Sequence, residues 1–325
     1  MRFGLIALGI GAVMVTALIG WFGAAAIGRE VLLAAWVIPP ILALHAVQLW
    51  FSAIAWRAAI GEAKPKVNRY LRIRWIREAV NSMLPVAQLG GNLVGIRLLM
   101  QRGISGPQAS AGTIIDVTIE AITQFLFTAA GIVILMMVSV DHSWAPWIQG
   151  GMIAMGAGLV GLVVAQRVGA LRAIEWLAER LGRLFPTISV DVVRGLHGEL
   201  LRLQKDRMAL LQATGLHLLA WVLGVAETWI AFYAIGIPCS WQEAMVIETM
   251  GMAARSAGFV VPGALGVQEA GFILAGGLFG IAPDASIALS MVKRVRELIV
   301  GLTGLVAWQL SEGKRLLWRP YTKRP

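Results

Sequence analysis

Long runs without a formally charged side chain constrain this chain more than any other feature. Phe3–Ile27, Val31–Trp56, Trp147–Val164 and Leu298–Leu310 contain no Asp, Glu, Lys or Arg. About 20 consecutive apolar residues cross the hydrocarbon core of a bilayer. Only 14% of the chain is charged and 58% is hydrophobic, against about 25% and about 45–50% in soluble domains. The sequence therefore predicts a polytopic all-α membrane protein in which residues 1–325 form one integral membrane domain.

The placement of the basic residues predicts which loops face the cytoplasm. Most Lys and Arg residues fall in three blocks, at residues 57–77, 167–207 and 314–324. By contrast, the links 28–30, 141–146 and 236–242 together hold one basic residue, Arg29. Loops rich in Lys and Arg stay in the cytoplasm, so we expect both chain termini there. The net charge of +10 thus reflects membrane topology, and we expect no nucleic acid partner.

Residues 79–100, AVNSMLPVAQLGGNLVGIRLLM, interrupt this topology. If residues 3–27 run outward and 31–56 return, one further crossing here would carry the second basic block outside. These 22 residues are too few for two crossings. We therefore expect a hairpin that enters from the cytoplasm and turns between Pro85 and Gly91. Its first arm extends back through NRYLRIRWIREAV.

A second interrupted segment spans residues 243–280 and contains VVPGALGVQEAG. The same count takes Met208–Ile235 outward and Ser286–Leu310 inward, so both ends of this segment lie outside. We expect a hairpin that enters from the opposite face and bends at Pro262. Two full crossings stay open as an alternative, because each arm has about 18 residues. Irregular backbone at membrane depth must pack in protein or line a wet cavity.

The two interrupted segments resemble each other. Pro85 is followed 22 residues later by Pro107, and Pro262 is followed 21 residues later by Pro283. Each copy reads as a Pro/Gly bend, a short helix, a Gly-Ile link and a long helix. The sequence thus predicts an inverted repeat with two broken or re-entrant helical hairpins, and broken helices at matching positions point to a transporter's central site. The predicted copies are residues 66–138 and 243–311.

Ionisable residues inside the predicted spans are candidates for function. Asp116 and Glu120 share one helix face because they are four residues apart, and charge within a span is costly without a partner. The second copy carries the bases Arg255, Lys293, Arg294 and Arg296, with Glu297 beside them. We expect Asp116 or Glu120 to pair with one of these bases or with Arg97. The alternative is a purely structural ion-pair network that locks the two halves together.

Polar residues flank both bends, where half-helix N-termini suit an anionic head group. The alternative is that they only cap broken helices. The expected helix breaks are Pro85, Gly90, Gly91, Pro262, Gly263 and Gly266. The candidate binding or translocation residues are Gln88, Asn92, Arg97, Asp116, Glu120, Arg255, Gln268, Glu269, Lys293, Arg294 and Arg296.

Other polar residues give weaker signals. His45, Gln48, His217 and Glu227 stand alone on apolar helices, which is typical of interhelical hydrogen bonding. One cysteine and four scattered histidines provide neither a disulfide framework nor a metal-ligand spacing, so we expect no metal or other cofactor. In residues 166–207, leucines such as 196, 200 and 203 recur at helical spacing between charges, which predicts amphipathic helices on the inner leaflet.

With these motifs in view, the chain resembles the lysylphosphatidylglycerol synthase transmembrane (flippase-like) family, and within it the HpnL-type proteins of hopanoid loci. LPVAQLGGNLVGIRLL resembles the first family signature, and VVPGALGVQEAG resembles the second, a Pro-Gly-x-x-Gly-x-x-Glu run. Asp116 and Glu120 match two acidic positions of the family. Two positions depart from the family pattern. Asn92 stands where a Glu is usual, and Val117 stands where an Arg is frequent.

This resemblance implies a lipid transporter or flippase of the bacterial inner membrane, for a hopanoid or for a lipid with an anionic or amino-modified head group. We expect no catalytic residues and hence no enzyme. A non-transporting partner that organises lipid-biosynthesis enzymes is the alternative, and a lipid transferase with Asp116 or Glu120 as general base ranks below it. The expected partners are membrane lipids, a second copy of the chain, or a partner enzyme.

The topology can be tested by cysteine labelling with a membrane-impermeant maleimide. We expect a cysteine placed at Val190 to react only from the cytoplasmic face, because it lies in a basic block. The native Cys239, in the link 236–242, serves as the reference and should react only from the outside. Labelling of position 190 in intact cells would overturn the topology.

Overall fold

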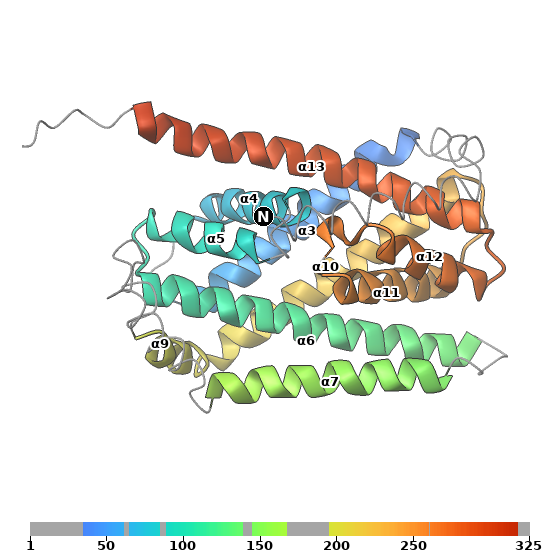
Figure 1. The fold of residues 1–325 in the computed structure, drawn as a ribbon, viewed down its shortest axis with the longest axis horizontal. Coiled ribbons are helices and arrows are strands. Elements are labelled where there is room, and N and C mark those ends of the chain that lie inside the picture. Colours follow the sequence, from blue (N-terminus) through green and yellow to red (C-terminus); the bar gives the residue numbers. More distant parts are fainter. Residues whose placement is uncertain are drawn as a thin grey trace, which may run out of the picture.

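The computed structural model describes residues 35–61, 65–84, 89–138, 145–167, 195–259 and 261–317. Several predictions fall outside these residues: the first span Phe3–Ile27, both chain termini, Pro85, Gln88 and most of the segment 166–207. Within the described residues, all regular structure is helical, as the sequence predicts. Figure 1 shows the long helices running side by side along the molecule.

The described helices fall into two parts of the chain. The first part contains η1 (Ala35–Val37), α3 (Ile38–Ile60), α4 (Val67–Met83), α5 (Gly90–Met100), α6 (Gly106–Val138) and α7 (Ala145–Arg167). The second part contains α9 (Leu196–Leu203), α10 (Arg207–Ala234), α11 (Trp241–Ala257), η3 (Pro262–Ala264), α12 (Val267–Gly277) and α13 (Pro283–Leu317).

Four described helices are long and apolar enough to cross a membrane. They cover Ala35–Ile60, Gly106–Val138, Gln149–Arg167 and Arg207–Ala234. Three of them lie close to the predicted spans Val31–Trp56, Trp147–Val164 and Met208–Ile235. The further predicted span Ser286–Leu310 lies within α13 but is not in this group, because charged residues interrupt its apolar sequence. This helix can lie at membrane depth only if those charges have partners.

The two interrupted segments have matched helix lengths. The arms α4 and α11 each have 17 residues, and the short helices α5 and α12 each have 11. Long helices follow, with 33 residues in α6 and 35 in α13. A helix of 11 residues is about 17 Å long, roughly half of the hydrocarbon core. Neither short helix is therefore long enough to cross a bilayer by itself.

Close backbone approach explains the glycines at the two breaks. A Cβ at Gly91 would lie 2.1 Å from the carbonyl oxygen of Arg77, so only glycine lets α5 begin against α4. At the second break, Gly263 and Gly266 have φ of +61° and +81°, in the region that favours glycine. A Cβ at Gly263 would lie 3.8 Å from the carbonyl oxygen of Ser82, which places the second break beside the end of α4.

The long helices pack across the two interrupted segments. Helix α13 lies along α4, and α6 lies along α11. Figure 1 shows α13 and α6 on opposite sides, with α4, α5, α11 and α12 between them. Helices α3 and α10 pack together and contact both long helices. This arrangement surrounds a central space with helices from both interrupted segments.

Helix α9 belongs to the predicted interfacial segment, but its apolar face packs on other helices. Leu196, Leu200 and Leu203 are buried in a cluster with Ala55 of α3 and Ile115 of α6. These leucines therefore contact protein rather than the lipid leaflet. The remainder of the segment up to residue 194 lies outside the described residues.

The packing of α12 on α11 can be tested at Gly251. A Cβ there would lie 2.1 Å from Cε1 of the buried Phe272, so we expect Gly251→Ala to destabilise the protein by about 1–3 kcal/mol through overpacking. Gly158 of α7 is the control, because nothing lies within 4 Å of its Cβ position. Thermal unfolding in detergent measures both variants, and equal unfolding temperatures would contradict the close contact between α11 and α12.

Candidate functional site

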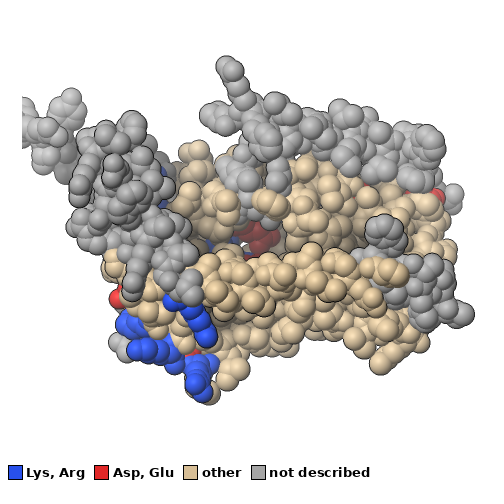
Figure 2. Space-filling view, turned by 60° about the horizontal axis from the view of Figure 1, so that its bottom comes forward, with Lys and Arg blue, Asp and Glu red and all other residues tan. Residues whose placement is uncertain are grey.

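A cavity of about 440 Å³ lies at the centre of the helices. Its lining comes from α3, α4, α5, α6, α10, α11, α12 and α13. Figure 2 shows a hollow in one face of the molecule, with charged side chains visible inside it. Leu89 and Phe259, the exposed apolar residues beside the two breaks, also line this cavity. The cavity therefore joins a charged interior to apolar residues at both breaks.

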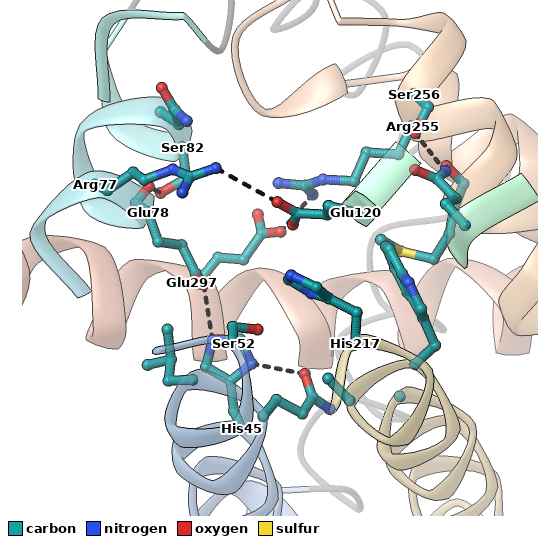
Figure 3. Close-up of a pocket in the computed structure, with 18 of the residues that line it drawn as sticks. His45, Ser52, Arg77, Glu78, Ser82, Glu120, His217, Arg255, Ser256 and Glu297 are labelled. Atoms are coloured by element: carbon teal, nitrogen blue, oxygen red, sulfur yellow. Dashed lines mark hydrogen bonds and ion pairs between the residues drawn. The ribbon is translucent and has the colours of Figure 1, made fainter. Parts of the chain in front are cut away.

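The first group of charges connects α4 with α6. Arg77 Nη1 lies 2.6 Å from Asp116 Oδ2, and Arg74 Nη2 lies 2.8 Å from Glu120 Oε1. Asp116 is fully buried and also lies 3.1 Å from Nε2 of His217 on α10. Arg77 lies over the ring of Trp56, 5.0 Å from its centroid. Figure 3 shows Arg77, Glu120 and Arg255 pointing into the same space.

The expected pairing of this acidic pair with the bases of residues 243–311 is wrong. Arg255, Lys293, Arg294 and Arg296 pair with other carboxylates, which are closer to them than Asp116 or Glu120 is. The bases that neutralise the acidic pair are Arg74 and Arg77, which the charge pattern of the sequence assigns to a cytoplasmic basic block. Arg74 and Arg77 are three residues apart, so they share one face of α4. This face is paired with the acidic face of α6, and both arginines are buried.

A second group of charges connects α10 and α11 with α13. Lys293 Nζ lies 2.8 Å from Glu248 Oε2 and 3.8 Å from Glu227 Oε2. Arg296 also pairs with Glu227, which accepts a hydrogen bond from Gln48 at 2.9 Å. The interpretation of Glu227 and Gln48 as interhelical hydrogen bonders is thus confirmed. Nothing in the sequence pattern indicated that Glu227 would hold two bases of α13.

A third group closes the second break. Glu269 Oε2 accepts a hydrogen bond from the Gly266 N–H at 2.7 Å and caps α12, while its Oε1 accepts one from Arg294 Nε at 2.9 Å. Arg294 also donates to the Gly263 carbonyl at 2.6 Å. Glu297 of α13 lies 2.8 Å from Arg294 and pairs with Arg255 as well. These contacts fasten the irregular backbone of the break to α13.

The structure brings part of the predicted set together around the cavity. Asn92, Glu120, Arg255, Gln268, Lys293 and Arg296 line it. Arg97, Asp116, Glu269 and Arg294 lie outside the lining, and Gln88 lies outside the described residues. Gly90 and Gly91 begin α5. The lining also contains charged and polar residues absent from the predicted set: His45, Gln48, Arg74, Arg77, Glu78, His217, Glu248 and Glu297.

The charges around the cavity differ in how far they are exposed. The side chains of Glu78 and Glu120 are 32% and 30% exposed, whereas Arg255 is 18% exposed and Lys293 only 5%. The most accessible charges are therefore carboxylates, with Arg255 as the most accessible of the paired bases in the lining. Among the described residues, no cluster of three His, Cys, Asp or Glu side chains is arranged to hold a metal ion.

Comparison with known families agrees with this picture of a membrane protein. The family described as the lysylphosphatidylglycerol synthase TM region matches residues 4–304. The chain therefore belongs to this family, which places it among membrane proteins of lipid modification or transport. Neither the curated proteins nor the solved structures compared with the chain gave a match.

The role of Glu269 can be tested with a matched pair of variants. We expect Glu269→Gln to destabilise the protein, because it removes the buried carboxylate that pairs with Arg294. Breaking a buried pair costs about 3–5 kcal/mol, and the remaining contact of Arg294 with Glu297 favours the lower end. Glu243→Gln is the control, since Glu243 caps α11 at the equivalent position through the Ser240 N–H.

Thermal unfolding of the purified variants distinguishes the outcomes. The expected result is a lower unfolding temperature for Glu269→Gln and a small change for Glu243→Gln. If both variants unfold like the wild type while only Glu269→Gln loses lipid movement in vesicles, Glu269 acts in transport and the structural assignment is wrong.

Proposed function

We propose that this chain moves a lipid across the membrane, with the head group in the central cavity and the acyl chains in the bilayer. The observation that carries this proposal is the cavity itself, which is charged inside and has Leu89 and Phe259 beside the two breaks. Its volume of about 440 Å³ lies in the range of small-molecule sites. Membership of a family of lipid modification or transport agrees with it.

Two features support an inverted repeat with two re-entrant hairpins. The matched order and lengths of α4–α5–α6 and α11–α12–α13 are those expected of two copies. The packing is also reciprocal, because the long helix of each copy lies along the first arm of the other. Short helices that end inside the bilayer are stable only where they line a protein cavity. We infer an inner-membrane protein with both termini in the cytoplasm from the basic loops.

The exposure of the charges favours a head group with both an amine and a phosphate. The most accessible carboxylates, Glu78 and Glu120, are suited to an ammonium group. Arg255, the most accessible paired base of the lining, is suited to a phosphate because arginine binds its oxygens with a rigid fork of donors. A hopanoid that carries an amine would satisfy Glu78 and Glu120 in the same way.

The hydrogen bonding of Asp116 favours a transporter over a lipid transferase. A general base must have a free lone pair and reach the proton that it abstracts. Asp116 accepts hydrogen bonds from Arg74, Arg77 and His217 and is fully buried. Glu120 is held by the same two arginines. Carboxylates paired in this way are weak bases, so the proposal assigns no enzymatic step to them.

Lipid movement can be measured in vesicles that contain the purified protein. The probe is phosphatidylethanolamine labelled on an acyl chain, so that its amine is free, and dithionite quenching reports the label left in the outer leaflet. We expect the wild type to accelerate exchange between leaflets. Glu120→Gln should slow it about tenfold, as expected for the loss of one charge-assisted hydrogen bond.

Glu199→Gln is the control, because Glu199 pairs with Arg202 on α9 and does not line the cavity. It should leave the rate unchanged. Phosphatidylglycerol labelled in the same way tests the need for an amine. If both probes exchange between leaflets no faster with folded protein than in empty vesicles, transport of these phospholipids is refuted. A non-transporting partner of lipid enzymes then becomes the better account.

A further inference from the structure

The hydrogen bonds of His45 differ from those of the other histidine in the cavity. His45 Nε2 lies 2.7 Å from Glu78 Oε1, and His45 Nδ1 lies 3.2 Å from Gln48 Oε1. Figure 3 shows contacts leaving the His45 ring on two sides. By contrast, His217 is held through Nε2, by Asp116. Both ring nitrogens of His45 therefore face oxygen atoms.

The orientation of Gln48 is fixed by a second carboxylate. Gln48 Nε2 donates to Glu227 Oε1 at 2.9 Å, so turning the amide over would set its oxygen against the Glu227 carboxylate. The Gln48 oxygen must then face His45 as an acceptor. A neutral imidazole has one N–H and can donate only once. With Glu78 ionised, both neighbours of the ring are acceptors, and they are satisfied only if both ring nitrogens carry a proton.

We propose that His45 is held as an imidazolium by Glu78 and Gln48, and that this proton is bound and released during lipid transport. The inference rests on the proposed function, to which it adds a coupling ion. The site is a proton-binding site in which His45 of α3 carries the proton. Glu78 of α4 supplies the counter-charge, and Gln48 orients the ring.

The charged groups around this site come from each helix that packs on it. Glu78 and Arg74 lie on α4, and Glu227 of α10 lies 3.8 Å from His45 Nδ1. Lys293 and Arg296 of α13 pair with Glu227. Arg296 also interacts electrostatically with Glu78. From α6 and α10, Asp116 and His217 pair with each other. The two bases of α13 offset the charge of Glu227, so Glu78 is the carboxylate left to balance the imidazolium.

The position of the pair provides a route for proton exchange. His45 and Glu78 both line the cavity, and the Glu78 side chain is 32% exposed. The pair joins α3 to α4, and through Gln48 and Glu227 it reaches α10 and α13. A movement that separates α3 from α4 removes the acceptor at Nε2. The imidazolium then loses its counter-charge, and its proton can pass to water in the cavity.

The protonation of His45 can be read directly by ¹⁵N NMR of histidine-labelled protein in lipid nanodiscs at pH 7. His45→Gln identifies the signals of His45. We expect both ring nitrogens of His45 to show the shifts of an imidazolium. In Glu78→Gln, the introduced amide can donate to Nε2, so we expect the signals of a neutral ring. A neutral His45 in the wild type would overturn the proposal, whether or not the protein moves lipid.

The coupling is tested in the vesicle assay with a pH gradient across the membrane. We expect the gradient to change the rate of lipid movement by the wild type. This dependence should be lost in His45→Gln, which removes the proton carrier but no residue assigned to the head group. Glu199→Gln is the control and should keep the dependence. If the wild type moves lipid equally well with and without the gradient, the coupling is refuted while the proposed transport stands. If it moves no lipid, the transport proposal fails and coupling with it, while NMR still decides the charge state.

Discussion

The structure depends on pairing charges that are buried among membrane helices. An ion without a partner is costly in such surroundings, and the bases of the central groups each have a carboxylate within reach. These pairs join α4 to α6, α10 and α11 to α13, and α12 to α13. Removing one member leaves its partner uncompensated, so the network constrains how the helices can pack. The same network gives the cavity its charged lining.

The two helix breaks determine where this charged cavity can open. Each break separates a helix arm from a helix of 11 residues. Neither interrupted segment therefore forms one continuous helix beside the cavity. Arg294 fastens the second break by binding Glu269 and the Gly263 carbonyl. Asn81 bridges the first break by accepting a hydrogen bond from the Gly91 N–H at 2.8 Å. Polar residues at the breaks thus hold irregular backbone in place, while their neighbours face the cavity.

Local sequence patterns indicate where the helices are interrupted. Glycines and prolines are rare inside helices for backbone reasons, so their clusters identified the bends, and α5 and α12 begin within or just after them. The acidic pair Asp116 and Glu120 was also recognisable as a part of the central network, because charge within an apolar run requires a partner. These signals depend only on residues close together in the chain.

The partners in the network could not be predicted in the same way. Arg74 and Arg77 lie in a strongly basic helix, which has the pattern of a cytoplasmic surface until the acidic face of α6 is placed against it. Glu227 and Glu248 stand on separate helices and meet Lys293 only after folding. A signal was present in α4, where Ile73 and Ile76 alternate with the arginines and are buried with them. Apolar residues on both sides of a basic pair indicate a buried face.

The central claim is that the cavity between the two broken segments holds a lipid head group. A cryo-electron microscopy map of the protein in nanodiscs of phosphatidylethanolamine tests this claim most directly. The account predicts head-group density between Glu120 and Arg255, with acyl chains leaving past Leu89 and Phe259 into the bilayer. A well-resolved cavity that contains only water, with every ordered lipid on the outer surface of the helices, would contradict it.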